Sequence, residues 1–262
     1  MVEQRTHVAE KKRIWEMFPR LAEAVRKAHE EVRLYGHHDW VHAFRVGDMA
    51  YRIGMDQYGD RTIARMAGVA GLCHNADRIL QKKLELGRRD VPEEKIRELV
   101  LAWLDRGSED FFNRPIVIED VVEAVLKHDS KEGEDLPVCI CLVDADKVVN
   151  CRPELLLRSA QNYHDLPVLD PIHWDRDPTA NYRDPKSVMK DVIMSSLEWA
   201  EEESPFCVKT RLAKKLINDS EIGAPFFRRY LELLKKSLKM EGLYPWPADL
   251  PSPMPPEKPS VV

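Results

Sequence analysis

Apolar residues recur at spacings of three and four along most of this 262-residue chain. Such spacing places them on one face of a helix, so it predicts amphipathic helices that pack together. Only residues 111–118 give a weak indication of a strand. We therefore expect an all-α fold, and a chain of this length can bury a sizeable core. The segments with helical spacing are residues 8–32, 39–54, 61–80, 92–104, 117–128, a segment that begins at Pro137, 186–202, 206–219 and 224–240.

Two proline-rich stretches interrupt this pattern. Residues 165–185 hold four prolines among several aspartates, and residues 245–262 hold seven prolines. Because proline lacks a backbone donor and has a fixed φ, neither stretch is expected to be helical. We expect a helical domain at 1–164, an excursion at 165–185, C-terminal helices at 186–244 that pack on the same domain, and a tail at 245–262.

Composition excludes several classes of protein. The net charge of −5 argues against binding to a nucleic-acid backbone, which favours basic proteins. Five cysteines without a CxxC pair are typical of reduced thiols in a cytoplasmic protein. The polar N-terminus has no apolar signal region, and no apolar run approaches the roughly 20 residues of a membrane span. We therefore expect a cytoplasmic protein with no membrane partner.

Three short clusters of imidazole and carboxylate side chains stand within the helical stretches. Imidazole nitrogens and carboxylate oxygens bind divalent metal ions, and a helical bundle can bring them together from distant parts of a chain. The clusters therefore indicate a metal site inside a bundle. They are His38-Asp39-Trp40-Val41-His42 with Arg45-Val46, His74-Asn75-Ala76-Asp77-Arg78, and Asp144-Ala145-Asp146-Lys147.

The order of these clusters resembles the HD-domain superfamily of metal-dependent phosphohydrolases, over residues 35–160. That family places a His, a His-Asp pair and a distant Asp on separate helices. By this resemblance, His42 is the first ligand, His74 belongs to the pair and Asp144 closes the site. The paired Asp of the family is replaced here by Asn75, which brings an oxygen but no charge. Either Asn75 or Asp77 is left to supply the remaining ligand.

The resemblance implies an HD-domain-like helical bundle with additional C-terminal helices, and one divalent ion, which is Mn, Fe, Co, Ni, Mg or Zn. Its expected ligands are His42, His74, Asn75 and Asp144. The expected catalytic residues are Asp77, Arg78, His128 and Lys147: the two cations face phosphate, and Asp77 or His128 handles a proton. Of the remaining residues, Asp39 is predicted to cap a helix, and His38 is expected in a surface loop.

These residues favour a metal-dependent phosphohydrolase that acts on a small phosphorylated molecule, either a nucleotide or a nucleoside phosphate. The loss of a charged ligand at Asn75 leaves open a non-catalytic metal- or nucleotide-binding HD module. A helical interaction protein, in which the same residues are structural, is the third interpretation. The chemistry of the site decides among them, because one fold can serve many functions.

Overall fold

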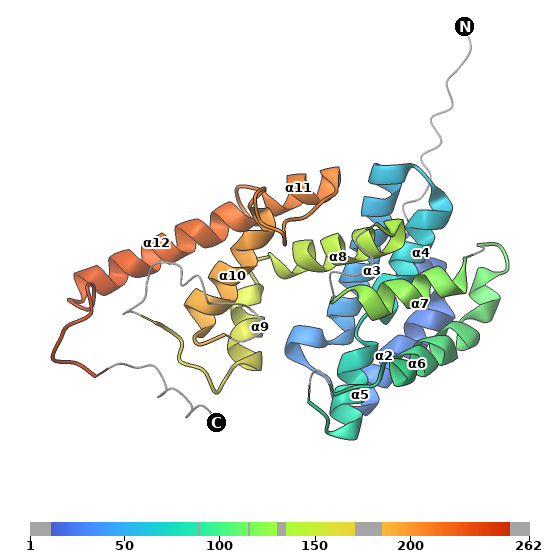
Figure 1. Ribbon diagram of the computed structural model, residues 1–262, viewed down its shortest axis with the longest axis horizontal. Coiled ribbons are helices and arrows are strands. Elements are labelled where there is room, and N and C mark those ends of the chain that lie inside the picture. The colour runs from blue at the N-terminus through green and yellow to red at the C-terminus, as the bar shows by residue number, and fades with distance from the viewer. Residues whose placement is uncertain (1–11, 88–89, 115, 130–134, 171–184, 252–262) are drawn as a thin grey trace, which may run out of the picture.

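The computed structural model describes residues 12–87, 90–114, 116–129, 135–170 and 185–251, and these residues form helices and no β-strand (Figure 1). The expected all-α fold is confirmed. Most of the predicted excursion, residues 171–184, and most of the tail, residues 252–262, lie outside the described residues. The main helices are α1 (Ile14–Met17), α2 (Pro19–Glu31), α3 (Trp40–Tyr58), α4 (Arg61–Cys73), α5 (Ala76–Leu84), α6 (Glu93–Arg106), α7 (Ile118–Lys127), α8 (Pro137–Asn150), α9 (Leu155–Asn162), α10 (Ile193–Leu197), α11 (Arg211–Ile217) and α12 (Ala224–Met240).

Helices α3 and α4 form the centre of the molecule, and their ends are fixed by local sequence. The carboxylate of Asp39 accepts a hydrogen bond from the backbone N–H of His42, so the predicted cap of α3 is confirmed. Gly59 ends α3 in the left-handed region, at φ 65°, where a residue without Cβ is favoured. Asp60 then caps α4 through the N–H of Thr62. This tight turn makes the two helices antiparallel neighbours.

Glycines let the backbones of α3 and α4 approach each other closely. A Cβ atom on Gly71 would lie 2.6 Å from the Cα of Gly47, and one on Gly54 would lie 2.7 Å from the Cα of Ala64. Helix α8 packs against both α3 and α4, and α7 packs against α4 and α8. The resulting core is rich in small and branched apolar residues, and it fixes the relative positions of α3, α4 and α8.

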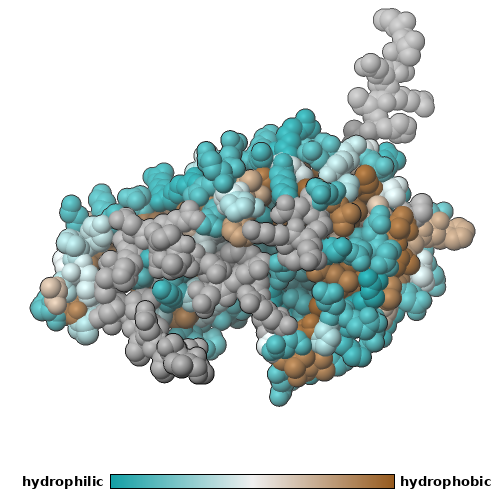
Figure 2. Space-filling view, in the orientation of Figure 1, coloured by the Kyte–Doolittle hydropathy of each residue, from teal (hydrophilic) through white to brown (hydrophobic). Residues whose placement is uncertain are grey.

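The C-terminal helices form a second group that extends away from this core (Figure 1). Helix α11 contacts α3 and α8, whereas α12 contacts α10. Helix α12 buries Ala224, Phe227, Leu231 and Leu238, which recur at helical spacing on one face. Figure 2 shows hydrophilic side chains along the edge of the molecule that α11 and α12 form. The predicted amphipathic pattern of residues 224–240 therefore places one face inward and one outward.

Several predicted segments differ from the structure. The described part of segment 8–32 forms two helices, α1 and α2, and only Arg211–Ile217 of segment 206–219 is helical. Residues 61–80 form two helices rather than one, because the chain turns at His74 and Asn75. Residues 186–202 combine a π-helical turn (Val188–Val192), α10 and a 3-10 turn (Glu198–Ala200). The weak strand signal at 111–118 corresponds, among its described residues, to the end of a 3-10 turn (Ser108–Phe111), a loop and the first residue of α7. The turn at His74 has a direct consequence for the site.

Candidate metal centre

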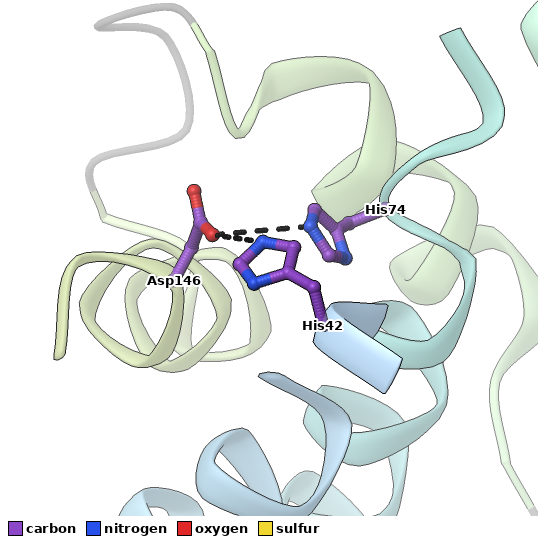
Figure 3. A group of neighbouring side chains, drawn as sticks. All are labelled: His42, His74 and Asp146. Atoms are coloured by element: carbon purple, nitrogen blue, oxygen red, sulfur yellow. Dashed lines mark ion pairs between the residues drawn. The ribbon is translucent and has the colours of Figure 1, made fainter. Parts of the chain in front are cut away.

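Two imidazoles and one carboxylate converge from three helices (Figure 3). His42 lies in the first turn of α3, His74 is the residue that ends α4, and Asp146 lies in α8. Because α3 and α4 are antiparallel, the start of one lies beside the end of the other. Helix α8 crosses both and adds the carboxylate. The core packing of these helices thus sets the position of all three side chains.

The distances within this group suit a shared metal ion. Asp146 Oδ1 lies 3.0 Å from His42 Nε2 and 3.8 Å from His74 Nε2, and the ligand atoms all lie within 4.8 Å of one another. Ligand atoms that bind one ion at about 2.1 Å lie about 3–4 Å apart. His42, His74 and Asp146 could therefore hold one metal ion with little rearrangement.

Both imidazoles have a buried nitrogen without a hydrogen bond. His42 Nε2 and His74 Nε2 are each buried and make no hydrogen bond of regular geometry, and the Asp146 carboxylate is the charged group that both approach, at 3.0 Å and 3.8 Å. An unsatisfied buried nitrogen is costly in a protein without a ligand there. Two of them directed at one carboxylate fit a metal site better than a structural cluster.

The other nitrogen of His74 is fixed by the end of its helix. His74 Nδ1 lies 2.7 Å from the carbonyl oxygen of Gly71 and donates to it. The proton is thus held at Nδ1, and Nε2 keeps the lone pair that a metal needs. The interrupted helix at residue 74 creates this arrangement, since it leaves the Gly71 carbonyl without its regular helical partner.

Asn150 and Arg158 support the group from behind. Asn150 Nδ2 donates to Asp146 Oδ1 at 2.9 Å, and Asn150 Oδ1 accepts from Arg158 Nη2 at 2.7 Å. Arg158 Nη2 also donates to the carbonyl of His37 at 2.9 Å. These two contacts use both hydrogens of Nη2, so its longer approach to His42 Nδ1, at 3.3 Å, does not fix the tautomer of His42.

The charge states of the three side chains are those of metal ligands. Burial lowers the pKa of His42 to about 4 and also lowers the pKa of His74. For Asp146, burial acts to raise the pKa, but the neighbouring imidazoles outweigh it and hold the pKa well below its usual range. Near neutral pH the group therefore presents neutral imidazoles and an ionised carboxylate, the forms that bind a metal.

The closing carboxylate is Asp146 and not Asp144, which was expected in this position. Asp144 is buried on another side of α8, where its Oδ2 accepts hydrogen bonds from the N–H of Thr210 at 2.6 Å and from Thr210 Oγ1 at 2.7 Å. The N–H of Lys209 donates to the same carboxylate. Asp144 therefore ties α8 to the start of α11, because an ionised oxygen satisfies the free amides at a helix start.

Asn75 lines a small cavity beside the three side chains, and its amide nitrogen makes hydrogen bonds within the protein. Asn75 Nδ2 donates to the carbonyl of His38 at 3.2 Å and to His29 Nε2 at 3.3 Å. An aspartate has no hydrogen to donate to either acceptor, so this pair of contacts explains an amide at position 75. A role for its oxygen as a fourth ligand stays a prediction.

Arg78 and Asp77 lie together at the edge of the cavity. The N–H of Arg78 donates to Asp77 Oδ1 at 2.7 Å, and Arg78 Nη2 lies 3.3 Å from Asp129 Oδ2. Arg78 Nε also lies 3.4 Å from Asp77 Oδ2, so two carboxylates hold the guanidinium over the cavity, and the Arg78 side chain is only 11% exposed. In the structure Asp77 is a partner of Arg78. A role for Asp77 as a metal ligand stays a prediction.

His128 and Lys147 also line the cavity. The ring of His128 lies 5.7 Å from that of His74, and its Nδ1 donates to the carbonyl of Val125 at 2.6 Å. Burial acts to lower the pKa of His128, but Asp129 and Asp77 reverse this effect and raise it. Lys147 Nζ donates to the carbonyl of Phe206, and burial lowers the pKa of its amine. All four residues predicted as catalytic therefore border one cavity.

The cavity itself is small, with a volume of about 90 Å³. One water molecule needs about 10–15 Å³ of such space, so the cavity can hold several waters or an ion with one phosphoryl group. His37 and His38 also line it, and the Nδ1 atoms of both are buried without a hydrogen bond. His38 was expected in a surface loop. The 3-10 turn Gly36–His38 instead brings it to the cavity.

Asn150 is the supporting residue that the sequence motifs did not indicate. It stands four residues after Asp146, so both lie on one face of α8. That spacing was available as a signal that Asp146, rather than Asp144, belongs to a polar face. Arg158 comes from the next helix, α9, and no motif connects it to His42.

Comparison of the chain with protein-family models, curated proteins and solved structures gave no match. Among the described helices, none combines the length and apolar character that a membrane span requires. The site geometry therefore carries the functional argument.

Proposed function

We propose that this protein is a metal-dependent phosphohydrolase of the HD-domain type that acts on a small phosphorylated molecule, such as a nucleotide or nucleoside phosphate. The observation that carries the proposal is the convergence of two buried Nε2 atoms, on His42 and His74, on the Asp146 carboxylate. The sequence resemblance adds support, since the same motif that was expected to close the site contains Asp146.

The residues that would hold the ion are His42, His74 and Asp146. When bound, such an ion supplies activation of a water and neutralisation of phosphoryl charge. Arg78 would bind the phosphoryl oxygens, because its guanidinium lies over the cavity and is held in place by Asp77 and Asp129. Lys147 would add a second cation at the same cavity.

His128 is our choice for the group that moves a proton. In the proposed reaction, water adds to phosphorus and gives up one proton, the bond from phosphorus to the leaving oxygen breaks, and that oxygen takes one proton, so that the proton lost by water restores the one that the leaving oxygen takes. Asp129 and Asp77 raise the pKa of His128 above its usual value despite its burial, which favours the imidazolium that can donate this proton. The small cavity fits the phosphoryl group, and the rest of a substrate would extend outward.

The test measures metal content and turnover on the same preparations. Elemental analysis should find a divalent metal in the wild type, and phosphate release from a panel of nucleotides and sugar phosphates should stop with chelator and return with Mn²⁺ or Co²⁺. We expect Arg78→Ala to raise KM about tenfold or more with unchanged metal content, because it removes a charged hydrogen bond to phosphate. Arg97→Ala is the matched control, since Arg97 pairs with Glu119 on the surface.

Two results would contradict the proposal in different ways. A protein that binds metal but turns over no compound of the panel with any ion is a non-catalytic binding module. A protein that neither contains nor takes up a divalent ion, with His42 and His74 intact, has a structural imidazole cluster instead.

A further inference from the structure

A second cavity lies at the opposite end of the α3–α4 pair. It is a groove of about 910 Å³, bordered by the C-terminal half of α3, the start of α4 and the residues before α1. Arg52 follows His42 by ten residues on α3, so at 1.5 Å per residue it lies about 15 Å further along that helix. The groove is therefore separate from the histidine cluster.

The groove is strongly basic in a protein whose net charge is −5. Its lining contains two carboxylates, Asp48 and Asp56, which are both already paired. Asp48 binds Arg13 at 2.7 Å, and Asp56 binds Arg211 at 3.0 Å. The cations of the lining are Lys12, Arg13, Arg52, Arg61, Arg65 and Arg114.

Four of these arginines, at positions 52, 61, 65 and 114, have no carboxylate partner within the described part of the chain. Other arginines of the surface are paired, such as Arg26 with Glu23 and Glu30, and Arg97 with Glu119 and Glu123. Arg61 and Arg65 are four residues apart on α4, a spacing at which like charges repel. A set of unpaired guanidinium groups around one hollow is the arrangement that binds an anion.

We propose that this groove binds an oligophosphate chain, either as inorganic polyphosphate or as the phosphate chain of a nucleoside triphosphate. Guanidinium groups bind phosphate oxygens in pairs, and several of them spaced along a groove match several linked phosphates. The volume lies in the range of small-molecule sites. Tyr51, Met17 and Met55 add less polar surface beside the arginines. This proposal does not depend on the proposed hydrolase activity.

The experiment uses isothermal titration calorimetry on the full chain, stripped of metal and dialysed free of chelator. The ligands are orthophosphate, pyrophosphate, tripolyphosphate and ATP. We expect affinity to rise with chain length and to fall with added salt, because each linked phosphate adds charge. Equal affinity for tripolyphosphate and ATP assigns the chain alone as the ligand, and tighter binding of ATP shows that the nucleoside also contributes.

The variant Arg52→Ala/Arg65→Ala tests the location. It should weaken tripolyphosphate binding about tenfold or more, since it removes two charged partners of the ligand. Arg228→Ala/Arg229→Ala removes two exposed arginines from α12 and should leave the affinity unchanged. Arg78→Ala should keep the affinity of the groove for tripolyphosphate, even though it removes a proposed phosphate contact in the separate histidine-lined cavity.

Three results would overturn the proposal: no tripolyphosphate binding at millimolar concentration, loss of binding in Arg78→Ala but not in Arg52→Ala/Arg65→Ala, or equal affinity for orthophosphate and tripolyphosphate. A single-stranded oligonucleotide that binds the groove more tightly than tripolyphosphate would also overturn it, in favour of nucleic acid. Melting curves by circular dichroism on each variant show that the fold is kept.

Discussion

The two ends of the α3–α4 pair present opposite kinds of chemistry. At one end, His74 and Asp146 line a cavity of about 90 Å³, and His42 lies beside them. At the other end, arginines border an open groove of about 910 Å³. Burial keeps the imidazoles neutral, which suits a metal ion, whereas the exposed guanidinium groups keep their charge, which suits an anion. The same helix pair thus carries a proposed cation site at one end and a proposed anion site at the other.

The largest expected effect is on metal affinity, and it should distinguish Asp146 from Asp144, two aspartates on α8. Asp146→Ala removes a proposed ligand and should weaken metal binding about a hundredfold, because loss of even supporting groups costs up to about that much. Tripolyphosphate binding at the groove should not change. Calorimetric titration with Mn²⁺ and with tripolyphosphate measures both.

Asp144→Ala is the control for this variant, since it removes a carboxylate two positions away. It leaves the amides of Lys209 and Thr210 without their acceptor, so we expect the free energy of unfolding to fall by about 2–3 kcal/mol. The metal affinity should stay within about twofold of the wild type. A loss of about 2–3 kcal/mol in metal binding itself would instead lower the affinity well over tenfold, because each 1.4 kcal/mol corresponds to a factor of ten. If Asp144→Ala loses metal binding and Asp146→Ala keeps it, then Asp144 is the metal ligand, as the sequence motif predicts.

These two aspartates also show how far sequence reasoning reaches. Apolar spacing predicts most helices, because burial of one face dominates their stability. The order of the clusters predicts that His42 and His74 meet a carboxylate from a later segment. The choice between Asp144 and Asp146 depends on the rotation of α8 about its axis, which the packing of α3, α4 and α11 sets. The motif alone does not contain that information.

The sequence alone did not predict the basic groove, because tertiary packing brings its arginines together. Arg52, Arg65 and Arg114 are separated by long stretches, and each alone resembles an ordinary surface arginine. Only the antiparallel arrangement of α3 and α4, with the loop before α7, brings them together. Their lack of carboxylate partners within the described residues becomes visible once ion pairs can be assigned.

A smaller effect tests whether the two ends are independent. Gly71→Ala places a Cβ atom 2.6 Å from the Cα of Gly47, and Gly54→Ala places one 2.7 Å from the Cα of Ala64. Each should lower the free energy of unfolding by up to about 3 kcal/mol, because backbone atoms must separate.

Each glycine variant should mainly affect its own end. The Gly71 carbonyl accepts the hydrogen bond from His74 Nδ1, so Gly71→Ala should weaken Mn²⁺ binding. A Cβ on Gly54 would press on Ala64, the residue before Arg65 of the groove, so Gly54→Ala should weaken tripolyphosphate binding. If either variant weakens the binding of Mn²⁺ and of tripolyphosphate equally, the two ends are not independent, because the helix pair then transmits strain from one end to the other.

The smallest expected effect concerns pH and the buried imidazole of His29. This side chain is 1% exposed, its Nδ1 donates to the carbonyl of Val25, and burial lowers its pKa from 6.5 to about 4. Between these two values the unfolded chain binds a proton at His29 and the folded protein does not. The free energy of unfolding should therefore fall as the pH decreases from 6.5 to about 4, with no contribution from His29 above that window and no further loss below it.

We expect the loss due to His29 between pH 7 and pH 5 to be at most about 2 kcal/mol, from the pKa difference. His29→Gln keeps groups that can bond to Val25 and Asn75 but does not titrate, so urea denaturation at the two pH values should show a smaller change for the variant than for the wild type. Arg52→Ala, at the other end of the helix pair, should show the same pH dependence as the wild type, because a guanidinium keeps its charge throughout this range. If His29→Gln retains the full pH dependence, other imidazoles of the cavity carry the acid sensitivity. If Arg52→Ala changes the pH dependence of the free energy of unfolding, the two ends of the α3–α4 pair are linked electrostatically despite their separation along α3.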